Sequence, residues 1–206
     1  MKNQEKIWDA EYKSHSSKWK KERINLPLIL KNKKVLEVGV GNGKNIQSIL
    51  KQKPSSLIAT DTSNAALLAC KKSHPNLKLV KDDIRASRFK DNEFDVVLCY
   101  YILNNLLEKD RIKAVREIRR ILSPKGIILF EDFMKGDFRQ ESHSQKAVEK
   151  STIIRKSGLI QHFFTKEEIG NLFFSFKKLK LKEKYFSTIF LKPHLKRKII
   201  SVSTEK

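Results

Sequence analysis

Cysteine is scarce in this chain, with only Cys70 and Cys99 among 206 residues. Two cysteines are too few for a disulfide framework, and both lie in apolar sequence surroundings. The N-terminal region contains no apolar run of the kind that a signal peptide needs. No window approaches the roughly 18 apolar residues of a membrane-spanning helix. These absences predict a cytoplasmic protein that does not enter the membrane.

Glycine and proline are also few, with seven and five residues, which argues against a fibrous or disordered chain. No internal repeat, low-complexity tract or linker divides the sequence. A folded chain of this length buries roughly 70% of the surface that its unfolded form exposes. We therefore expect a single domain over residues 1–206.

The chain has only 23 acidic residues against 44 lysines and arginines, so the formal net charge is +21. The segment before Val35 carries +6 and the segment after Asp132 carries +10. Such an excess favours polyanionic partners such as nucleic acids. A lysine-rich composition without a binding role would give the same charge, so both interpretations stay open.

Short apolar segments alternate with amphipathic ones along most of the chain. The pattern predicts strands at 34–38, 57–61, 77–80, 94–101 and 126–130, and helices at 45–51, 64–74 and 110–122. Thr165 and Glu168 form a capping box that opens a helix at 169–176. The alternating stretches 178–184 and 185–191 predict a C-terminal antiparallel hairpin. This order predicts an α/β fold, a doubly wound Rossmann-like domain with a mostly parallel seven-stranded sheet.

The first strand runs into a glycine-rich turn, with the sequence E-V-G-V-G-N-G at 37–43. Glycines let the backbone adopt positive φ and let a ligand approach the main chain closely. The third glycine comes one position too early for the dinucleotide fingerprint G-x-G-x-x-G, which disfavours NAD and FAD. Lys44 is followed by Asn45, where a phosphate-binding loop needs a hydroxyl residue, so ATP hydrolysis is disfavoured too.

An acid followed by G-x-G-x-G at the end of the first strand resembles the first motif of the class I S-adenosylmethionine (SAM)-dependent methyltransferases. The resemblance covers residues 35–132 and implies that SAM is the cofactor. It implies that Gly39, Gly41 and Gly43 line the methionine part of SAM. Glu37 would support the turn and, often through water, the amino group of SAM.

Two acidic positions further along the chain strengthen this resemblance. Asp61 ends the second strand, where the family places the acid that accepts both ribose hydroxyls of SAM, and Thr62 follows it. In the D-D-I stretch at 82–84, Asp83 would accept from the adenine amino group and the Ile84 backbone would meet the ring. A helix cap and a surface acid are the alternative roles for Asp61 and Asp83.

The segment that closes the fourth strand normally faces the reactive methyl group in this family. Cys99 is assigned to the cofactor site and Tyr100 is a candidate catalytic residue, with core packing as the alternative for each. No Pro-Cys or Thr-Cys pair is present, which disfavours a nucleophilic cysteine. Asn104 and Asn105 stand where relatives often carry a histidine pair, so the role of those histidines is not transferred.

His162 precedes the capped helix in H-F-F-T-K-E-E, which is similar to segments near the end of many small methyltransferases. It is a candidate acceptor-side catalytic residue, with hydrogen bonding at the helix entry as the alternative. The five histidines are scattered, so no metal site is expected.

The resemblance divides the domain into three parts. Residues 1–34 resemble a helical lid, although their aromatic residues beside lysines are also suited to stacking on bases. Residues 35–132 form the SAM-binding core, and residues 133–206 hold an acceptor-side insertion followed by the last helix and strands.

Three functions are consistent with these features. The favoured one is methyl transfer to RNA, tRNA first, with the basic flanks as the binding surface. The alternative is a methyltransferase for a small-molecule acceptor. The third is a catalytically silent SAM-fold subunit that binds RNA or a protein. Oligomeric state is not determined by any feature of the sequence.

Overall fold

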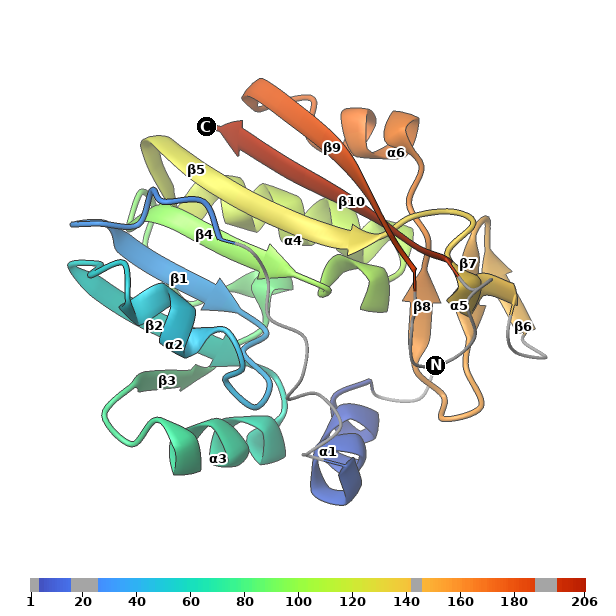
Figure 1. Cartoon of the computed structure of the whole chain (residues 1–206), viewed down its shortest axis with the longest axis horizontal. Helices are drawn as coiled ribbons and strands as arrows, with labels where there is room; N and C mark the ends of the chain where they lie inside the picture. Colours follow the sequence, from blue (N-terminus) through green and yellow to red (C-terminus); the bar gives the residue numbers. More distant parts are fainter. Residues whose placement is uncertain (1–3, 16–25, 142–145, 188–195) are drawn as a thin grey trace.

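The computed structural model describes residues 4–15, 26–141, 146–187 and 196–206 (Figure 1). A seven-stranded sheet forms the centre, in the order β3-β2-β1-β4-β5-β10-β9. Its strands are β1 (Lys34–Val38), β2 (Ser56–Asp61), β3 (Lys78–Lys81), β4 (Phe94–Tyr100), β5 (Leu122–Phe133), β9 (Lys177–Ser187) and β10 (Lys196–Glu205). The helices are α1 (Gln4–His15), α2 (Ile46–Leu50), α3 (Asn64–Ser73), α4 (Glu108–Ile121), α5 (Phe138–Glu141) and α6 (Lys166–Leu172), with 3-10 turns η1 (Ile84–Ala86) and η2 (Leu103–Asn105).

The first five strands are parallel, and β10 is antiparallel to both β5 and β9. The expected α/β fold with a mostly parallel seven-stranded sheet is therefore confirmed. The chain leaves β1 toward β2 and β3, and then crosses back to place β4 on the other side of β1. In sheets of this kind, the carboxyl ends of the two strands at this reversal border the ligand crevice.

Two hydrophobic clusters cover the two faces of the sheet because successive strand residues point to opposite sides. Leu36 and Val97 pack on one face with α4 and α6, whereas Val35 and Leu98 pack on the other with α2 and α3. Strands β1 and β4 are thus apolar on both faces, which explains their nearly continuous hydrophobic sequences. No described helix is long and apolar enough to cross a membrane.

The C-terminal hairpin is present, but its strands lie later in the chain than predicted. The expected strands at 178–184 and 185–191 are incorrect, because β9 runs without interruption from Lys177 to Ser187. No glycine, proline, asparagine or aspartate stands at the predicted break, so nothing in the local sequence ends the strand there. The partner strand is β10, at Lys196–Glu205, and residues 188–191 of the second predicted strand lie outside the described residues.

Two further predictions about the last third need correction. The N-cap of α6 is confirmed, since the Glu168 N–H donates to Thr165 Oγ1 at 3.1 Å, but the helix ends at Leu172 instead of 176. Phe173 and Phe176, which follow the helix, both pack in the core. The insertion also forms a separate antiparallel sheet, of β6 (Lys146–Glu149), β7 (Thr152–Ile154) and β8 (Ile160–His162), which was not predicted.

The central strand β4 offers a test of the core. Leu98 is fully buried, whereas Leu68 on α3 is 65% exposed. Replacing Leu98 with alanine is expected to lower the free energy of unfolding by about 2–5 kcal/mol, because it leaves a cavity in a closely packed layer. Urea denaturation measures the change, and Leu68→Ala should stay within about 1 kcal/mol of the parent. Equal losses in both variants would contradict this packing.

Candidate active site

The glycine turn after β1 is held by the ends of the neighbouring strand. The Val40 N–H donates to the Thr60 carbonyl at 2.8 Å, and the Gly41 N–H donates to Asp61 Oδ2 at 2.9 Å. Gly41 has φ of +56°, a conformation that favours glycine. The first motif and the acid at the end of β2 therefore form one unit, as the sequence spacing predicts.

Asp61 is the hydrogen-bonding centre of this unit. Its other oxygen, Oδ1, accepts from the Ser63 N–H at 2.9 Å. Burial raises the pKa of Asp61 to about 6, although the hydrogen bonds from Ser63 and Gly41 partly oppose the shift. A carboxylate has about four lone-pair sites, and the backbone N–H groups of Gly41, Thr62 and Ser63 already donate to this one. The acceptor capacity that remains can serve hydroxyl groups of a ligand.

Glu37 lies beneath the glycine turn and is 2% exposed. Its Oε1 accepts from Asn45 Nδ2 at 2.8 Å, while Oε2 is buried and has no hydrogen-bond partner among the described residues. Burial raises the pKa of Glu37 to about 7 against the opposing effect of the Asn45 hydrogen bond. An unpartnered buried carboxylate oxygen is costly by itself, and a cationic ligand group would offset this cost.

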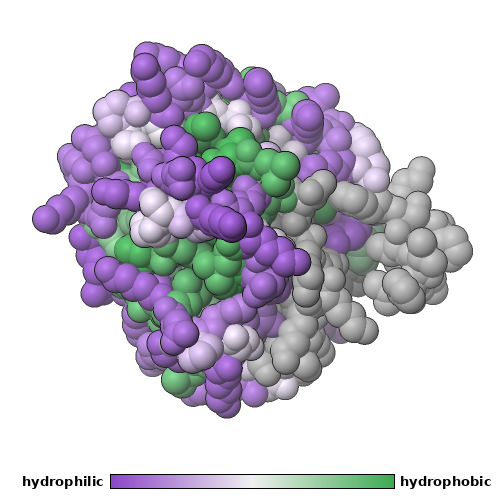
Figure 2. All heavy atoms as spheres, turned by 60° about the vertical axis from the view of Figure 1, so that its left-hand side comes forward, coloured by the Kyte–Doolittle hydropathy of each residue, from purple (hydrophilic) through white to green (hydrophobic). Residues whose placement is uncertain are grey.

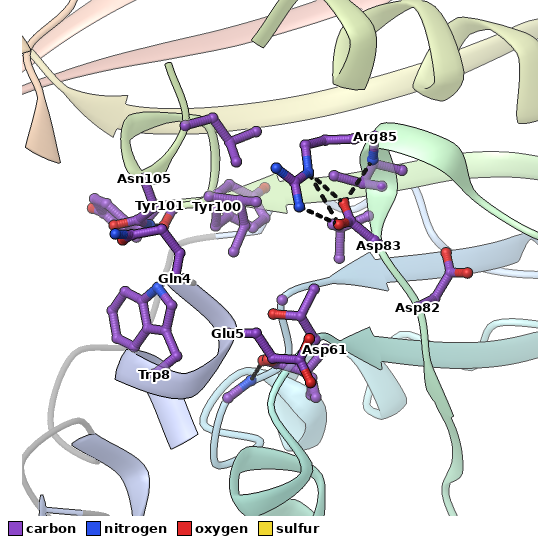
Figure 3. A pocket seen from close by; sticks show the side chains of 18 of the residues that line it. Gln4, Glu5, Trp8, Asp61, Asp82, Asp83, Arg85, Tyr100, Tyr101 and Asn105 are labelled. Atoms are coloured by element: carbon purple, nitrogen blue, oxygen red, sulfur yellow. Dashed lines mark hydrogen bonds and ion pairs between the residues drawn. The ribbon is translucent and has the colours of Figure 1, made fainter. Parts of the chain in front are cut away.

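A cavity of about 510 Å³ opens at the carboxyl ends of β1 and β4 (Figure 3). Its size is in the range of small-molecule and cofactor sites, roughly 300–1,000 Å³. Seven of the sequence-predicted site residues line it, namely Gly39, Gly41, Asp61, Thr62, Asp83, Ile84 and Tyr100. These residues come from the ends of four strands, β1 to β4, and the turns that follow them, so the fold brings most of the predicted cofactor site together.

One end of the cavity is closed by an ion-paired cluster that the sequence did not reveal. Arg85 binds Asp83 through Nε at 2.9 Å and also contacts Asp110 at 2.9 Å. Burial alone would raise the pKa of Asp83, but the hydrogen bonds from Arg85 outweigh this effect and lower it. Asp83 thus lines the cavity, but its carboxylate is already bound to a cation of the same wall.

Helix α1 forms one wall of the cavity. Its Tyr12 hydroxyl packs so closely on Gly41 that a Cβ there would lie 2.4 Å from the oxygen. Asp9 Oδ1 accepts from the Ser63 hydroxyl at 2.6 Å, which ties α1 to the start of α3. The Gln4 amide donates to the Gly158 carbonyl at 3.1 Å, which ties α1 to the loop before β8. The N-terminal helix therefore connects the strand ends with the insertion.

The opposite end of the cavity is aromatic. Figure 3 shows Trp8 and Gln4 of α1 on the same side as Tyr101 and Asn105, away from Asp83 and Arg85. Tyr101 has φ of +59°, and its carbonyl accepts from Asn105 Nδ2 at 2.8 Å. These residues surround a space suited to a flat ring. Trp8 was recognisable in the sequence as part of the N-terminal segment, whereas Tyr101 and Asn105 had no assigned role.

The two asparagines after β4, Asn104 and Asn105, have different surroundings. Asn104 is 2% exposed, and both its backbone N–H and its side-chain amide donate to the buried carboxylate of Asp132. Asn105, by contrast, lines the cavity. Burial raises the pKa of Asp132 to about 7, against the opposing hydrogen bonds from Phe133 and Asn104. Asn104 therefore anchors the loop that carries Tyr101 and Asn105.

Four predicted site residues do not line the cavity. Glu37 lies below it, as described above. Gly43 packs against α3, where a Cβ would lie 2.7 Å from Cys70 Sγ. Cys99 is fully buried in the core cluster beside α4, which matches its alternative role in packing, and burial raises its thiol pKa above the usual range.

His162 is the fourth of these residues and is 1% exposed. Its Nδ1 lies 2.7 Å from the Thr152 hydroxyl and its Nε2 lies 2.8 Å from Glu168 Oε1. Both ring nitrogens therefore face residues of the insertion and of α6, outside the residues that line the cavity. This geometry matches the alternative role, hydrogen bonding at the entry to the last helix.

Comparisons with known proteins agree with this geometry. Residues 36–130 match the family model described as a methyltransferase domain. The chain is 24% identical to a tRNA N(3)-methylcytidine methyltransferase of Schizosaccharomyces pombe, over 82% of this chain and 77% of that protein. It is 26% identical to a tRNA N(3)-cytidine methyltransferase of Danio rerio, over 69% of this chain but only 44% of that protein.

A solved structure shares the fold. It is the 1,6-didemethyltoxoflavin-N1-methyltransferase of Burkholderia thailandensis with bound 1,6-didemethyltoxoflavin and S-adenosylhomocysteine. The TM-score is 0.70 at 15% identity, and the alignment covers 98% of this chain and 86% of that one. Residues 36–130 are thus a methyltransferase domain, and the chain shares the fold of the SAM-dependent methyltransferases. Its cofactor is SAM.

The buried Glu37 carboxyl leads to a pH-dependent prediction. Because its pKa in the folded protein, about 7, exceeds the ordinary value of 4.5, folding favours the protonated form. Its contribution to stability is present at low pH and is lost as the pH rises through about 7. A Glu37→Gln variant has no proton to lose. Between about pH 5 and pH 8, we expect it to gain one to a few kcal/mol of stability relative to the parent.

Urea denaturation across this pH range measures the difference between the two proteins. The comparison cancels the pH dependence of all other groups, which both proteins share. Parallel stability profiles for the parent and Glu37→Gln would contradict a raised pKa at Glu37.

Proposed function

We propose that the protein transfers the methyl group of SAM to a base of tRNA, and that the acceptor atom is N3 of a cytidine. The alignment with a tRNA N(3)-methylcytidine methyltransferase over 82% of the chain carries this proposal. The aligned length includes most of the domain rather than the cofactor motif alone. The aromatic end of the cavity supports it, because Trp8 and Tyr101 there offer ring faces for a planar base.

The proposed cofactor site uses the residues that line the strand ends. Gly39 and Gly41 allow the methionine part of SAM to approach the main chain, and Asp61 accepts from the ribose hydroxyls at its remaining lone pairs. The unpartnered Oε2 of Glu37 fits the positive charge of the SAM amino group, directly or through water. Ile84, with the Asp83–Arg85 pair behind it, forms the wall at the adenine end.

The reaction needs alignment more than acid or base chemistry. When bound, SAM supplies a methyl group that its sulfonium already makes electrophilic. A ring nitrogen such as N3 of cytosine carries a lone pair at neutral pH, so no proton has to be removed before attack. Holding two reactants in line can supply on the order of 7–11 kcal/mol. Helix α1 and the Tyr101–Asn105 loop would provide this alignment and exclude water.

Tyr100, predicted as a catalytic residue, fits a role as a donor. It lines the cavity, and burial, followed by the charge of Glu131, raises the pKa of its phenol beyond the normal range. The phenol therefore keeps its proton at neutral pH and can hydrogen-bond to an acceptor or a substrate carbonyl.

The compartment and the partner follow from the same proposal. Cys70 and Cys99 are buried free thiols, which is consistent with the reducing cytosol where tRNA is modified. The net charge of +21 would then serve the binding of the RNA backbone.

A small-molecule acceptor is the second candidate. The specific observation in its favour is the Burkholderia thailandensis structure, whose bound 1,6-didemethyltoxoflavin is a small planar heterocycle, and whose fold covers 98% of this chain. The same aromatic end of the cavity would accept such a ring.

Transfer of radiolabelled methyl from SAM to a total cell extract separates the two candidates. We expect the label in RNase-sensitive material of tRNA size, and nucleoside analysis should identify 3-methylcytidine. A label that appears only in the small-molecule fraction would replace the tRNA proposal with the second candidate. Methylation of a different tRNA nucleoside would retain the substrate class and reject the acceptor atom.

Asp61→Ala tests the cofactor site independently of the acceptor. Loss of even one hydrogen bond to a charged group costs about 1.5–3 kcal/mol, so SAM affinity should fall about tenfold or more. Isothermal titration with SAM measures the change. The control is Asp91→Ala, whose side chain is 70% exposed and lies outside the cavity. Unchanged SAM affinity in Asp61→Ala would exclude Asp61 as the ribose ligand.

A further inference from the structure

The last two strands of the sheet have one apolar and one cationic face. Leu181 of β9 packs against the core cluster with Ile200 and Val202 of β10. Because side chains alternate along a strand, Lys180, Lys182 and Lys184 point to the opposite face. On this face they lie beside the short side chains of β10, since Lys180 pairs with Ser203 and Lys182 pairs with Ser201. We call this surface the lysine face, defined by Lys180, Lys182, Lys184, Ser201 and Ser203.

The lysine face is accessible. Lys180 and Lys182 are exposed, and neither forms a salt bridge within the part of the chain that the structure describes. Helices α2 and α3 lie on the same side of the sheet, but they pack over the strands at its other end (Figure 1). Figure 2 shows mostly hydrophilic side chains along the upper rim of the molecule, the height at which β9 begins in Figure 1, with a hydrophobic patch below them. Cationic groups without an internal partner can bind an external anion.

A chain of contacts leads from the lysine face to the aromatic end of the cavity. Lys184 Nζ binds Glu131 Oε2, and Glu131 Oε1 accepts from the Tyr101 hydroxyl at 2.7 Å. Tyr101 lines the cavity, and Lys44 Nζ lies 5.6 Å from its ring centroid. Across the sheet, Glu131 pairs with Ser201, which in turn pairs with Lys182. The lysine face therefore begins at the wall where the acceptor would enter.

We propose that the lysine face binds the sugar–phosphate backbone of the RNA whose target base enters the cavity. This inference rests on the proposed function and adds to it the surface that holds the substrate. Residues two apart on a strand are about 6.6 Å apart, so Lys180 and Lys182 present two separate charges along the strand direction. Lysine binds phosphate as a point charge, and serine hydroxyls donate to phosphate oxygens. The short serines also let the backbone of the RNA approach the sheet.

RNA fits this surface better than an acidic protein segment, because the contacts connect it to a cavity with aromatic walls. A partner that binds the lysine face and the cavity together must place anions on the lysine face and a planar acceptor ring in the cavity. A polynucleotide has both in each repeating unit. Lys184 is paired with Glu131, so it adds little net charge to the lysine face and mainly links this face to Glu131.

The test is a double variant, Lys180→Gln with Lys182→Gln, and its matched control is Lys71→Gln with Lys72→Gln. The control removes the same charge from two exposed lysines of α3 that do not line the cavity. Binding of tRNA is measured over a series of salt concentrations, and methylation is measured at saturating SAM. Each lost phosphate contact reduces the slope of log affinity against log salt by about 0.7–0.9.

We expect the Lys180/Lys182 variant to reduce this slope by up to about 2 and to raise KM for tRNA severalfold, with kcat and SAM affinity unchanged. The control should behave as the parent. Equal slopes and KM values in the parent and the Lys180/Lys182 variant would overturn the proposal. Equal losses in both double variants would also overturn it, because they would reflect total charge instead of a located surface.

The outcome is separable from that of the proposed function. If the parent enzyme methylates only small molecules, the tRNA proposal fails and the lysine face loses its proposed ligand. If the parent methylates tRNA and the Lys180/Lys182 variant does so with the same KM, the proposed function holds and only the lysine face is rejected.

Discussion

The hydrogen bond from the Gly41 N–H to Asp61 is the interaction on which the site depends. It joins the turn after β1 to the end of β2, and the Val40–Thr60 bond beside it fixes the same junction. Helix α1 then docks on this junction, with Tyr12 against Gly41 and Asp9 against Ser63. One buried carboxylate therefore organises the cofactor end of the cavity and the position of the helix that covers it.

The distribution of charge follows from the same constraint. Acids are concentrated under the glycine turn, where burial raises the pKa of both Glu37 and Asp61. In the proposed site, the positive charge of the SAM amino group would compensate the buried Glu37 carboxylate, so binding SAM would also stabilise the site. Cations without internal partners lie outside, on β9, where a polyanionic substrate can meet them. The molecule thus separates the charges that would face the cofactor from those that would face the acceptor.

Local patterns predicted the parts of the fold whose causes are local. The strand–turn–helix around Glu37 and the glycines, the acid at the end of β2 and the N-cap at Thr165 depend on residues that are neighbours in the chain. The strand order then follows from the α/β alternation, because right-handed crossovers between parallel strands leave few alternatives. This is why six of the nine predicted cofactor residues, from Gly39 to Ile84, line one cavity. The break predicted within β9 had no such signal and was wrong.

By itself, the sequence determined the fold, the glycine-rich turn after β1 and the acid that completes it, since these depend on backbone conformation and short-range spacing. Only the tertiary structure decided which side chains close the cavity. The Gln4–Gly158 bond joins residues 154 positions apart, and the Tyr101–Glu131–Lys184 chain joins three strand ends. It also buried His162 between Thr152 and Glu168 and left Lys180 and Lys182 exposed. Such contacts form when distant segments pack, and no pattern within one segment specifies its partner in another.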